Sequence, residues 1–430
     1  MEGKSSNLLS EQQRLETKLS KMLQDVKPPE KDGLLMQCIY RIPPRLRETN
    51  PKAYTPRIVS IGPFHKTIDV GKEDSIFESM EKLKLKYLKG FLNRTLLPVE
   101  NIVVLLKNME DKIRSCYGAP IKHDSHDFLK MILIDACFMI ELFLRSHSYK
   151  DWEGKDPLLL KPWMQRDIKK DLILLENQLP FFVLEQIYNL TSINKEFPSF
   201  LEITFKYFNT FCLGTVCTKE SPKHFTDLLR SSAISSSKLD RRRTNEDKVI
   251  HVYSASQLRE AGLKFEVSSN KGLLDLTYFD KGVLSMSRLN IDDDTEMVFR
   301  NIIAFEHCHL LDTRIITQYV LILDSLINTE KDVNLLVDKK IIVNLMGDAN
   351  ATAAMFNNLC TNVNVPDSSC GYISVCNSLN AFYENPRNKY RAIFVHEYFN
   401  TPWKIASTSA AIILLLLTLI QTICSMISLF

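Results

Sequence analysis

Two short histidine-containing runs are the first places to look for catalytic or metal chemistry. Glu306-His307-Cys308-His309 contains a Glu-x-x-His pair, the spacing with which carboxylate-bridged di-iron bundles bind metal from facing helices. Such a site needs a second pair, and the chain has only this one. His307 and His309 project about 200° apart on a helix of 3.6 residues per turn, so they do not share a metal. We interpret the run as a hydrogen-bonded structural cluster.

The second run, His123-Asp-Ser-His126, directly precedes a predicted helix. Asp124 and Ser125 are residue types that cap helix N-termini, which accounts for the run without a metal. The cysteines are widely spaced, as between Cys212 and Cys217, and no Cys-x-x-Cys is present. We therefore expect neither a zinc site nor a bound cofactor.

Glycine spacing excludes the common nucleotide sites. The 13 glycines are never closer than the nine residues that separate Gly62 from Gly71. A P-loop, a dinucleotide fingerprint, a kinase glycine loop and a nucleophile elbow all need closer glycines. Nucleotide hydrolysis by these routes is excluded.

The remaining candidates for chemistry are polar residues within largely apolar stretches: Asp135, Glu141, Glu176, Asn177, Gln178, Glu306 and His309. One interpretation is an enzyme in which these side chains line a single pocket. The other is a structural hydrogen-bond lattice that bridges a helix break at Pro180, since buried polar groups must be paired. Carboxylates that are dispersed or fully paired, with no open cavity beside them, would disfavour the enzyme. We assign no catalytic residue.

Residues 41–66 carry a local positive charge. Six basic residues stand there against one acid, Glu48. A surface patch of this kind attracts phosphates or anionic lipid headgroups. Alternatively, the arginines pin the segment to the helical body through carboxylates such as Asp135, Glu141 or Glu176. Nucleic acid is not an expected partner, because neither interleaved aromatics nor a basic helix face appears.

The elements that must position these residues are mostly helices. Of 430 residues, 45% are hydrophobic and 24% charged, with 54 basic and 51 acidic side chains, as in an ordinary folded protein. Apolar periodicity predicts helices over 75–93, 99–117, 125–145, 165–177, 181–190, 200–213, 295–311 and 315–328. A further helix begins at a Thr329/Asp332 capping box, and Gly347 is expected to close it. The run 128–144 is too charged for a membrane span and is expected to be a core helix.

Other patterns complete the predicted organisation. An amphipathic helix over residues 8–26, within an N-terminal region 1–32, is expected to pack on its own domain or to self-associate. Residues 39–65 are proline-punctuated and therefore irregular and extended. Residues 231–248 read as a mobile loop. Between about 263 and 290 the period changes to that of strands, with a hairpin turn at Asp280-Lys-Gly282.

The C-terminal segment predicts a membrane helix. Lys404 is the last charged residue, and the 26 residues from Ile405 to Phe430 are apolar apart from small hydroxyls and Gln421. About 20 such residues cross a bilayer. The expected span is residues 404–430, with its apolar centre at Leu414, Leu415, Leu416 and Leu417.

Charge bias predicts the orientation of this span. Arg387, Lys389, Arg391 and Lys404 precede it, so the positive-inside rule places the large domain in the cytosol. No signal peptide is evident in residues 1–25, which suggests a tail-anchored protein. Three sequons, at Asn93, Asn189 and Asn350, argue for the opposite orientation. Whether the membrane is the plasma membrane or an endomembrane stays open.

Several stretches together resemble the plant family called domain of unknown function 247. They are Ile39-Tyr-Arg-Ile-Pro-Pro44, residues 53–65, Asp135-Ala-Cys-Phe-Met-Ile-Glu141, residues 171–182, 255–265 and 299–306, and Asn328-Thr-Glu-Lys-Asp332. Chain length alone allows about three domains. The resemblance implies instead one large helical domain, over residues 33–403, followed by a membrane helix. It also implies no established activity and no catalytic residue; some relatives are associated with self-incompatibility and flower sex determination.

These observations favour a single-pass, tail-anchored membrane protein that is not an enzyme. We expect its helical domain to recognise another protein, or a second copy of itself, in plant reproductive or developmental signalling. The expected partners are thus the lipid bilayer and a protein. The alternatives are a membrane-anchored enzyme that uses the buried carboxylates, and a receptor-like protein with its large domain outside the cell.

Overall fold

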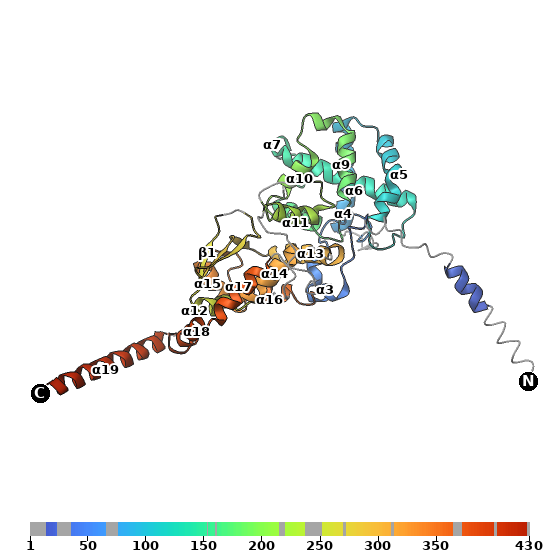
Figure 1. The fold of residues 1–430 in the computed structure, drawn as a ribbon. Coiled ribbons are helices and arrows are strands. Elements are labelled where there is room, and N and C mark those ends of the chain that lie inside the picture. Colours follow the sequence, from blue (N-terminus) through green and yellow to red (C-terminus); the bar gives the residue numbers. More distant parts are fainter. Residues whose placement is uncertain are drawn as a thin grey trace, which may run out of the picture.

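Helices make up most of the computed structural model, which describes residues 14–23, 36–65, 76–152, 154–159, 161–214, 220–236, 252–269, 272–310, 314–363, 372–399 and 402–427. Figure 1 shows a helical body from which one long C-terminal helix projects. The predicted fold class is confirmed: mainly helical, with a small β insertion and one apolar C-terminal helix.

Helix α6 (Ser125–His147) is the centre of the first half of the body. Nearly every residue from Phe128 to Arg145 is buried, which explains why the helix is apolar on all sides. The prediction that this run is a core helix is confirmed. The helices packed on it are α4 (Ile76–Thr95), α5 (Val99–Ser115), α7 (Tyr149–Trp152), α9 (Phe181–Leu190) and α10 (Phe200–Tyr207).

The second half of the body is arranged around α13 (Thr295–His309). Its neighbours are α11 (Phe225–Ser235), α14 (Ile315–Leu326) and α16 (Ala349–Leu359). Farther out lie α12 (Ala255–Glu260), α15 (Glu330–Asp338), α17 (Ile373–Glu384) and α18 (Pro386–Phe399). One continuous cluster of buried apolar side chains runs through both halves.

Two small sheets lie in the second half. In the first, β3 (Val283–Met286) pairs antiparallel with β2 (Leu276–Phe279) and parallel with β1 (Lys264–Val267). The predicted hairpin is confirmed, with Gly282 at a φ of +72° in its turn. The second sheet, a parallel pair of β4 (Leu289–Ile291) and β5 (Ile342–Asn344), was not predicted. Strands of three residues are too short to show an alternating pattern.

The N-terminal segment, residues 36–65, combines irregular backbone with two short helices. These are α3 (Pro44–Thr49) and the 3-10 helix η1 (Pro51–Tyr54), and each begins with proline. Proline is favoured at a first helical position, because its fixed φ suits the helix and it has no N–H to leave unpaired. The expectation of a wholly extended segment is therefore wrong for residues 44–54.

The predicted helix over 165–177 also needs correction. The observed helix, α8 (Pro162–Leu172), ends five residues earlier. Its last two carbonyls accept hydrogen bonds from side chains of the following turn: Asn177 Nδ2 donates to Asp171 and Gln178 Nε2 donates to Leu172. Gln178 Nε2 also donates to the carbonyl of Leu174, within the turn itself. These bonds stop the helix before Pro180 does. Pro180 lies directly before α9. Proline is favoured at a helix start because it has no N–H group to leave unpaired.

Several other boundaries differ from the predictions. Helix α10 ends at Tyr207 instead of residue 213. Residues 231–235, expected in a mobile loop, complete α11, and 237–250 lie outside the described residues. The Thr329/Asp332 capping box is confirmed, but α15 ends at Asp338 and Gly347 does not close it.

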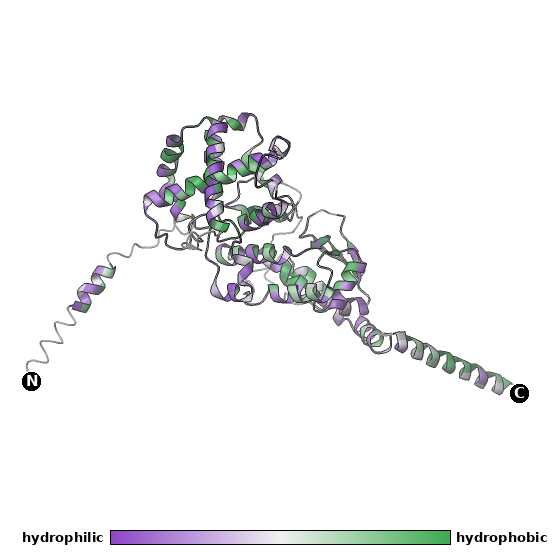
Figure 2. Ribbon diagram, turned by 180° about the vertical axis from the view of Figure 1, so that it is seen from behind, coloured by the Kyte–Doolittle hydropathy of each residue, from purple (hydrophilic) through white to green (hydrophobic). Residues whose placement is uncertain are grey.

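The two ends of the chain lie apart from the body (Figure 1). Residues 14–23 are helical and exposed throughout, so the packing on the domain expected for this stripe is not found there. The most apolar 18-residue stretch of helix α19 (Pro402–Ile427) has a mean hydropathy of 2.4, and none of that stretch is buried. Figure 2 shows that it is largely hydrophobic along its length. It is long and apolar enough to cross a membrane; Phe430 lies outside the described residues.

Candidate functional site

The N-terminal segment crosses the turn at residues 171–178, and its backbone amides meet buried side chains there. The Asp171 carboxylate accepts hydrogen bonds from three consecutive N–H groups, those of Arg57, Ile58 and Val59, at 2.9, 2.8 and 2.9 Å. Extended backbone away from a sheet has no ladder partner for these donors. The carboxylate takes that role. Burial raises the pKa of Asp171 to about 6, although the three amides favour the ionised form.

Asn177 binds the part of the N-terminal segment that follows the amides held by Asp171. Its Oδ1 accepts from the N–H of Ile61 at 2.7 Å, while its Nδ2 donates to the carbonyl of Val59 at 3.0 Å. It thus presents an acceptor and a donor to the segment, as the backbone of a neighbouring strand would. The next N–H, that of Gly62, donates to Asp135 Oδ2 at 2.9 Å.

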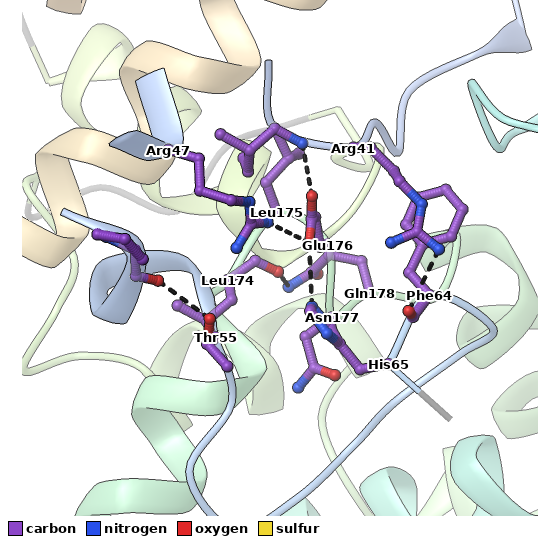
Figure 3. Close-up of polar contacts among 12 residues, drawn as sticks. Arg41, Arg47, Thr55, Phe64, His65, Leu174, Leu175, Glu176, Asn177 and Gln178 are labelled. Atoms are coloured by element: carbon purple, nitrogen blue, oxygen red, sulfur yellow. Dashed lines mark hydrogen bonds and ion pairs between the residues drawn. The ribbon is translucent and has the colours of Figure 1, made fainter. Parts of the chain in front are cut away.

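Glu176 holds both ends of the N-terminal segment, as Figure 3 shows. Its carboxylate accepts from the N–H of Ile42 at 2.6 Å and from Arg47 Nη2 at 2.6 Å, and lies 3.2 Å from His65 Nε2. Burial opposes ionisation, but the bonds from His65, Arg47 and Ile42 together bring the pKa of Glu176 below its ordinary value. Arg47 therefore makes the contact expected if basic residues pin this segment to the body.

An ionic group joins α4 and α6 to the N-terminal segment. Lys84 is fully buried, and its Nζ lies 2.7 Å from both Asp135 and Glu81 and donates to the Ser60 carbonyl. Burial lowers the pKa of Lys84, but the two carboxylates more than compensate and raise it. Farther along α6, Glu141 pairs with Arg94 at 2.9 Å and with Arg145 at 2.7 Å.

Glu306 and Gln178 satisfy the N-termini of helices. The Glu306 carboxylate accepts from the N–H groups of Ile316 and Thr317 in the first turn of α14, which has no side-chain cap of its own. Arg230 donates to the same carboxylate at 2.8 Å. Gln178 Oε1 accepts from the N–H of Phe225, the first residue of α11, at 2.9 Å. Both side chains thus supply acceptors that a helix start lacks.

The structure therefore places the predicted polar residues in several distinct sets. Asp135, Glu176, Asn177 and Gln178 surround the N-terminal segment and the 171–178 turn, whereas Glu141 and Glu306 bind other partners. His309 Nδ1 lies 3.0 Å from the Tyr40 hydroxyl. Asp124 accepts from the N–H of Asp127 and caps α6, as predicted. Among the described residues, no three His, Cys, Asp or Glu side chains are grouped as metal ligands.

Two adjoining surface cavities, of about 290 and 390 Å³, lie elsewhere, between α8, the loop that follows α10, β4 and the start of α13. Thr210, Phe211, Asp292 and Asp294 line both of them. Asp294 is bound there by Arg166 at 2.8 Å and by Lys170 at 2.7 Å. None of the seven predicted polar residues lines either cavity.

The profile of the family DUF247, described as "Plant protein of unknown function", matches residues 39–417. The chain belongs to this family. The match begins within the N-terminal segment, so the DUF247 region includes both partners of the hydrogen-bond lattice described above. Among curated relatives from Arabidopsis thaliana, "UPF0481 protein At3g47200" is 30% identical over 91% of this chain and 86% of its own length. "Putative UPF0481 protein At3g02645" is 22% identical over 89% of each chain. No solved structure matches this DUF247 protein.

Sequence reasoning missed two of the most connected groups in this DUF247 protein. Asp171 lies within one of the stretches that carry the family resemblance, which was a usable signal, but its bonds reach residues more than 110 positions away. Lys84 gave no signal, because it stands among the solvent-facing lysines of α4. Only the packing of α4 on α6 reveals that it is buried.

A glycine comparison tests how closely the N-terminal segment fits the 171–178 turn. Gly62 and Gly154 both have positive φ, +68° and +76°. A Cβ at Gly62 would lie 2.7 Å from the carbonyl oxygen of Gln178, whereas at Gly154 it would meet nothing within 4 Å. Gly154→Ala should cost about 1–2 kcal/mol of unfolding free energy through backbone strain alone. Gly62→Ala should lower the unfolding free energy by about 1–3 kcal/mol more than Gly154→Ala does, because the backbone N–H groups of the N-terminal segment lose their hydrogen-bond partners. Urea unfolding of both variants in detergent measures this difference, and equal losses would contradict the tight fit.

His224 gives a pH-dependent prediction. It is fully buried, its Nε2 lies 2.9 Å from the Cys38 carbonyl and its Nδ1 accepts from the Asp227 N–H, so the neutral form fits both contacts. Burial lowers its pKa from 6.5 to about 4. The stabilisation this shift represents is present above pH 6.5 and is lost as the pH falls toward 4, to a total of about 3 kcal/mol. His224→Asn retains a capping acceptor but does not titrate. The unfolding free energy of the His224→Asn variant should therefore fall less steeply between pH 6.5 and 4 than that of the parent. Parallel slopes would show that His224 does not cause this pH dependence.

Proposed function

We propose that this DUF247 protein is a membrane-anchored recognition protein, held in the bilayer by α19 and facing the cytosol with its helical body. In this proposal the body binds another protein, or a second copy of itself, and catalyses no reaction. A role in plant reproductive or developmental signalling is part of the same proposal.

The exposure of α19 is the observation that carries the membrane part. From Trp403 to Ile427 the helix contains one charged residue, Lys404, near its start, and none of it is covered by the body. Burying an apolar helix of this length is favoured by roughly 25 cal/mol for each Å² removed from water. A bilayer provides such burial over about 20 residues.

Charge supports the cytosolic orientation. Arg387, Lys389, Arg391 and Lys404 precede the apolar run, against Glu384 and Glu397. Positive residues are retained on the cytosolic side of a span.

The paired state of the buried charges supports recognition over catalysis. A catalytic acid or base must reach a substrate within hydrogen-bond distance. Asp135, Glu176 and Glu306 are buried and bound to backbone amides or cations within the chain, and the two cavities lie away from them.

Protease treatment of intact membrane vesicles tests the orientation. We expect an added protease to digest the body and leave a short protected fragment that contains α19. Asn93, Asn189 and Asn350 are all exposed, so they would be available for glycosylation if the body were on the other side. A protected body, or a glycosidase-sensitive mobility shift that disappears in the Asn→Gln variants, would reverse the proposed orientation.

Proximity labelling tests recognition. A biotin ligase fused to the N-terminus of the full chain should label proteins that are not labelled by the same ligase fused to residues 386–430 alone. The shorter fusion has the same anchor and lacks the body. A second tagged copy among the labelled proteins would indicate self-association. Identical labelled sets from the two fusions would contradict a recognition role for the body.

A further inference from the structure

Helix α18 carries an outward aromatic face. The exposed fraction is 73% for Tyr390 and 51% for each of Ile393, Phe394 and Tyr398. At 3.6 residues per turn these four side chains share one side of the helix. Single exposed apolar residues are ordinary on protein surfaces, but a contiguous group marks a surface that another phase or molecule covers.

Contacts with the body lie on the flank and on the far side of α18 from the aromatic face. Ala392 is buried in the contact with α12. The Arg391 guanidinium lies against Gly262, where a Cβ would be only 2.5 Å from its Nη1. His396 Nδ1 lies 3.4 Å from Glu260 Oε1. The buried Ala392 lies on the side of α18 that faces the body, so the aromatic face, about 180° around the helix, points away from it.

The aromatic face is continuous with the apolar helix α19. Helix α19 begins at Pro402, and its Thr408 hydroxyl donates to the carbonyl of Tyr398 at 3.2 Å. Trp403, 85% exposed, lies at the start of α19. Aromatic side chains of this kind gather where a span enters the headgroup layer. Figure 1 shows α18 at the junction between the body and α19.

We infer that α18 lies in the headgroup layer of the membrane that α19 crosses, with its aromatic face toward the acyl chains. This rests on the proposed anchoring by α19 and adds a second contact, which holds the body against the bilayer. Amphipathic helices with aromatic residues on one face and basic residues beside it bind membranes in this way.

Charge favours the bilayer over a second copy of α18 as the occupant. Arg387, Lys389 and Arg391 lie on this helix and Lys404 follows it, against one acid on the helix, Glu397. Anionic lipids of the cytosolic leaflet attract such residues. Two copies of α18 placed face to face would bring like charges together instead.

Tryptophan quenching in reconstituted full-length protein tests this inference. Vesicles of phosphatidylcholine and phosphatidylserine would carry acyl chains brominated near the headgroup, which quench nearby tryptophan. The parent has three tryptophans, so the emission of a new tryptophan is obtained by subtracting the emission of the parent. For Phe394→Trp, this added emission should shift to the blue and lose most of its intensity in these vesicles. In His396→Trp, two residues along and about 200° around the helix, it should lose little. Val104→Trp, at an exposed position on α5, is a second control for a side chain far from the membrane.

The outcomes separate the anchor from the interfacial helix. Extraction of the protein from vesicles by alkaline carbonate would overturn the anchoring by α19 and, with it, this inference. Resistance to extraction together with equal quenching at positions 394 and 396 would overturn only the interfacial position of α18. A further variant combines Phe394→Trp with Tyr390→Ser and Tyr398→Ser. Loss of quenching at position 394 in this variant, with an unchanged melting temperature, would support the interfacial position of α18. Cross-linking of position 394 to a second copy, without lipid quenching, would overturn it in favour of a dimer.

Discussion

Extended backbone in a protein interior needs partners for its N–H groups, and here side chains from distant helices provide them. Asp171 binds three consecutive amides, and Asn177, Asp135 and Glu176 bind others of the N-terminal segment. Each acceptor is itself fixed, Asp135 by Lys84 and Glu176 by Arg47. Because unpaired buried amides are costly, the segment and the helices around it must form together or not at all.

This arrangement explains why a chain with so many buried charges need not be an enzyme. In active sites, perturbed carboxylates face a cavity that admits substrate. Asp135, Glu141, Asp171, Glu176 and Glu306 instead cap helices, bind extended backbone or neutralise cations within the fold. Their positions within the DUF247 region are accounted for by the folded state alone. The parts that face outward are the surface of the body with its two cavities, the aromatic side of α18 and the whole of α19.

The sequence predicted features governed by nearby residues. The helix from Phe181 to Leu190, the Thr329/Asp332 capping box and the turn at Gly282 each depend on a few adjacent side chains, and each was predicted correctly. The polar candidates were recognisable because charged residues within apolar runs need partners. Their partners were not recognisable, since Ile58 and Asp171 are 113 positions apart. The end of α8 was misplaced because the helical pattern of residues 165–177 does not show that the amides of Asn177 and Gln178 bind the last carbonyls of α8 in the fold.

The separation between the N-terminal segment and its acceptors also sets an order of events during synthesis. Residues 57–62 leave the ribosome long before Asp171 and Asn177 exist, and until then water must satisfy their amides. Contacts of such sequence separation are slow to form, because a long loop must close first. Docking of the segment is therefore a late step of folding, after α4, α5 and α6 have already emerged. A nascent chain that ends before residue 171 has no means of completing its own core.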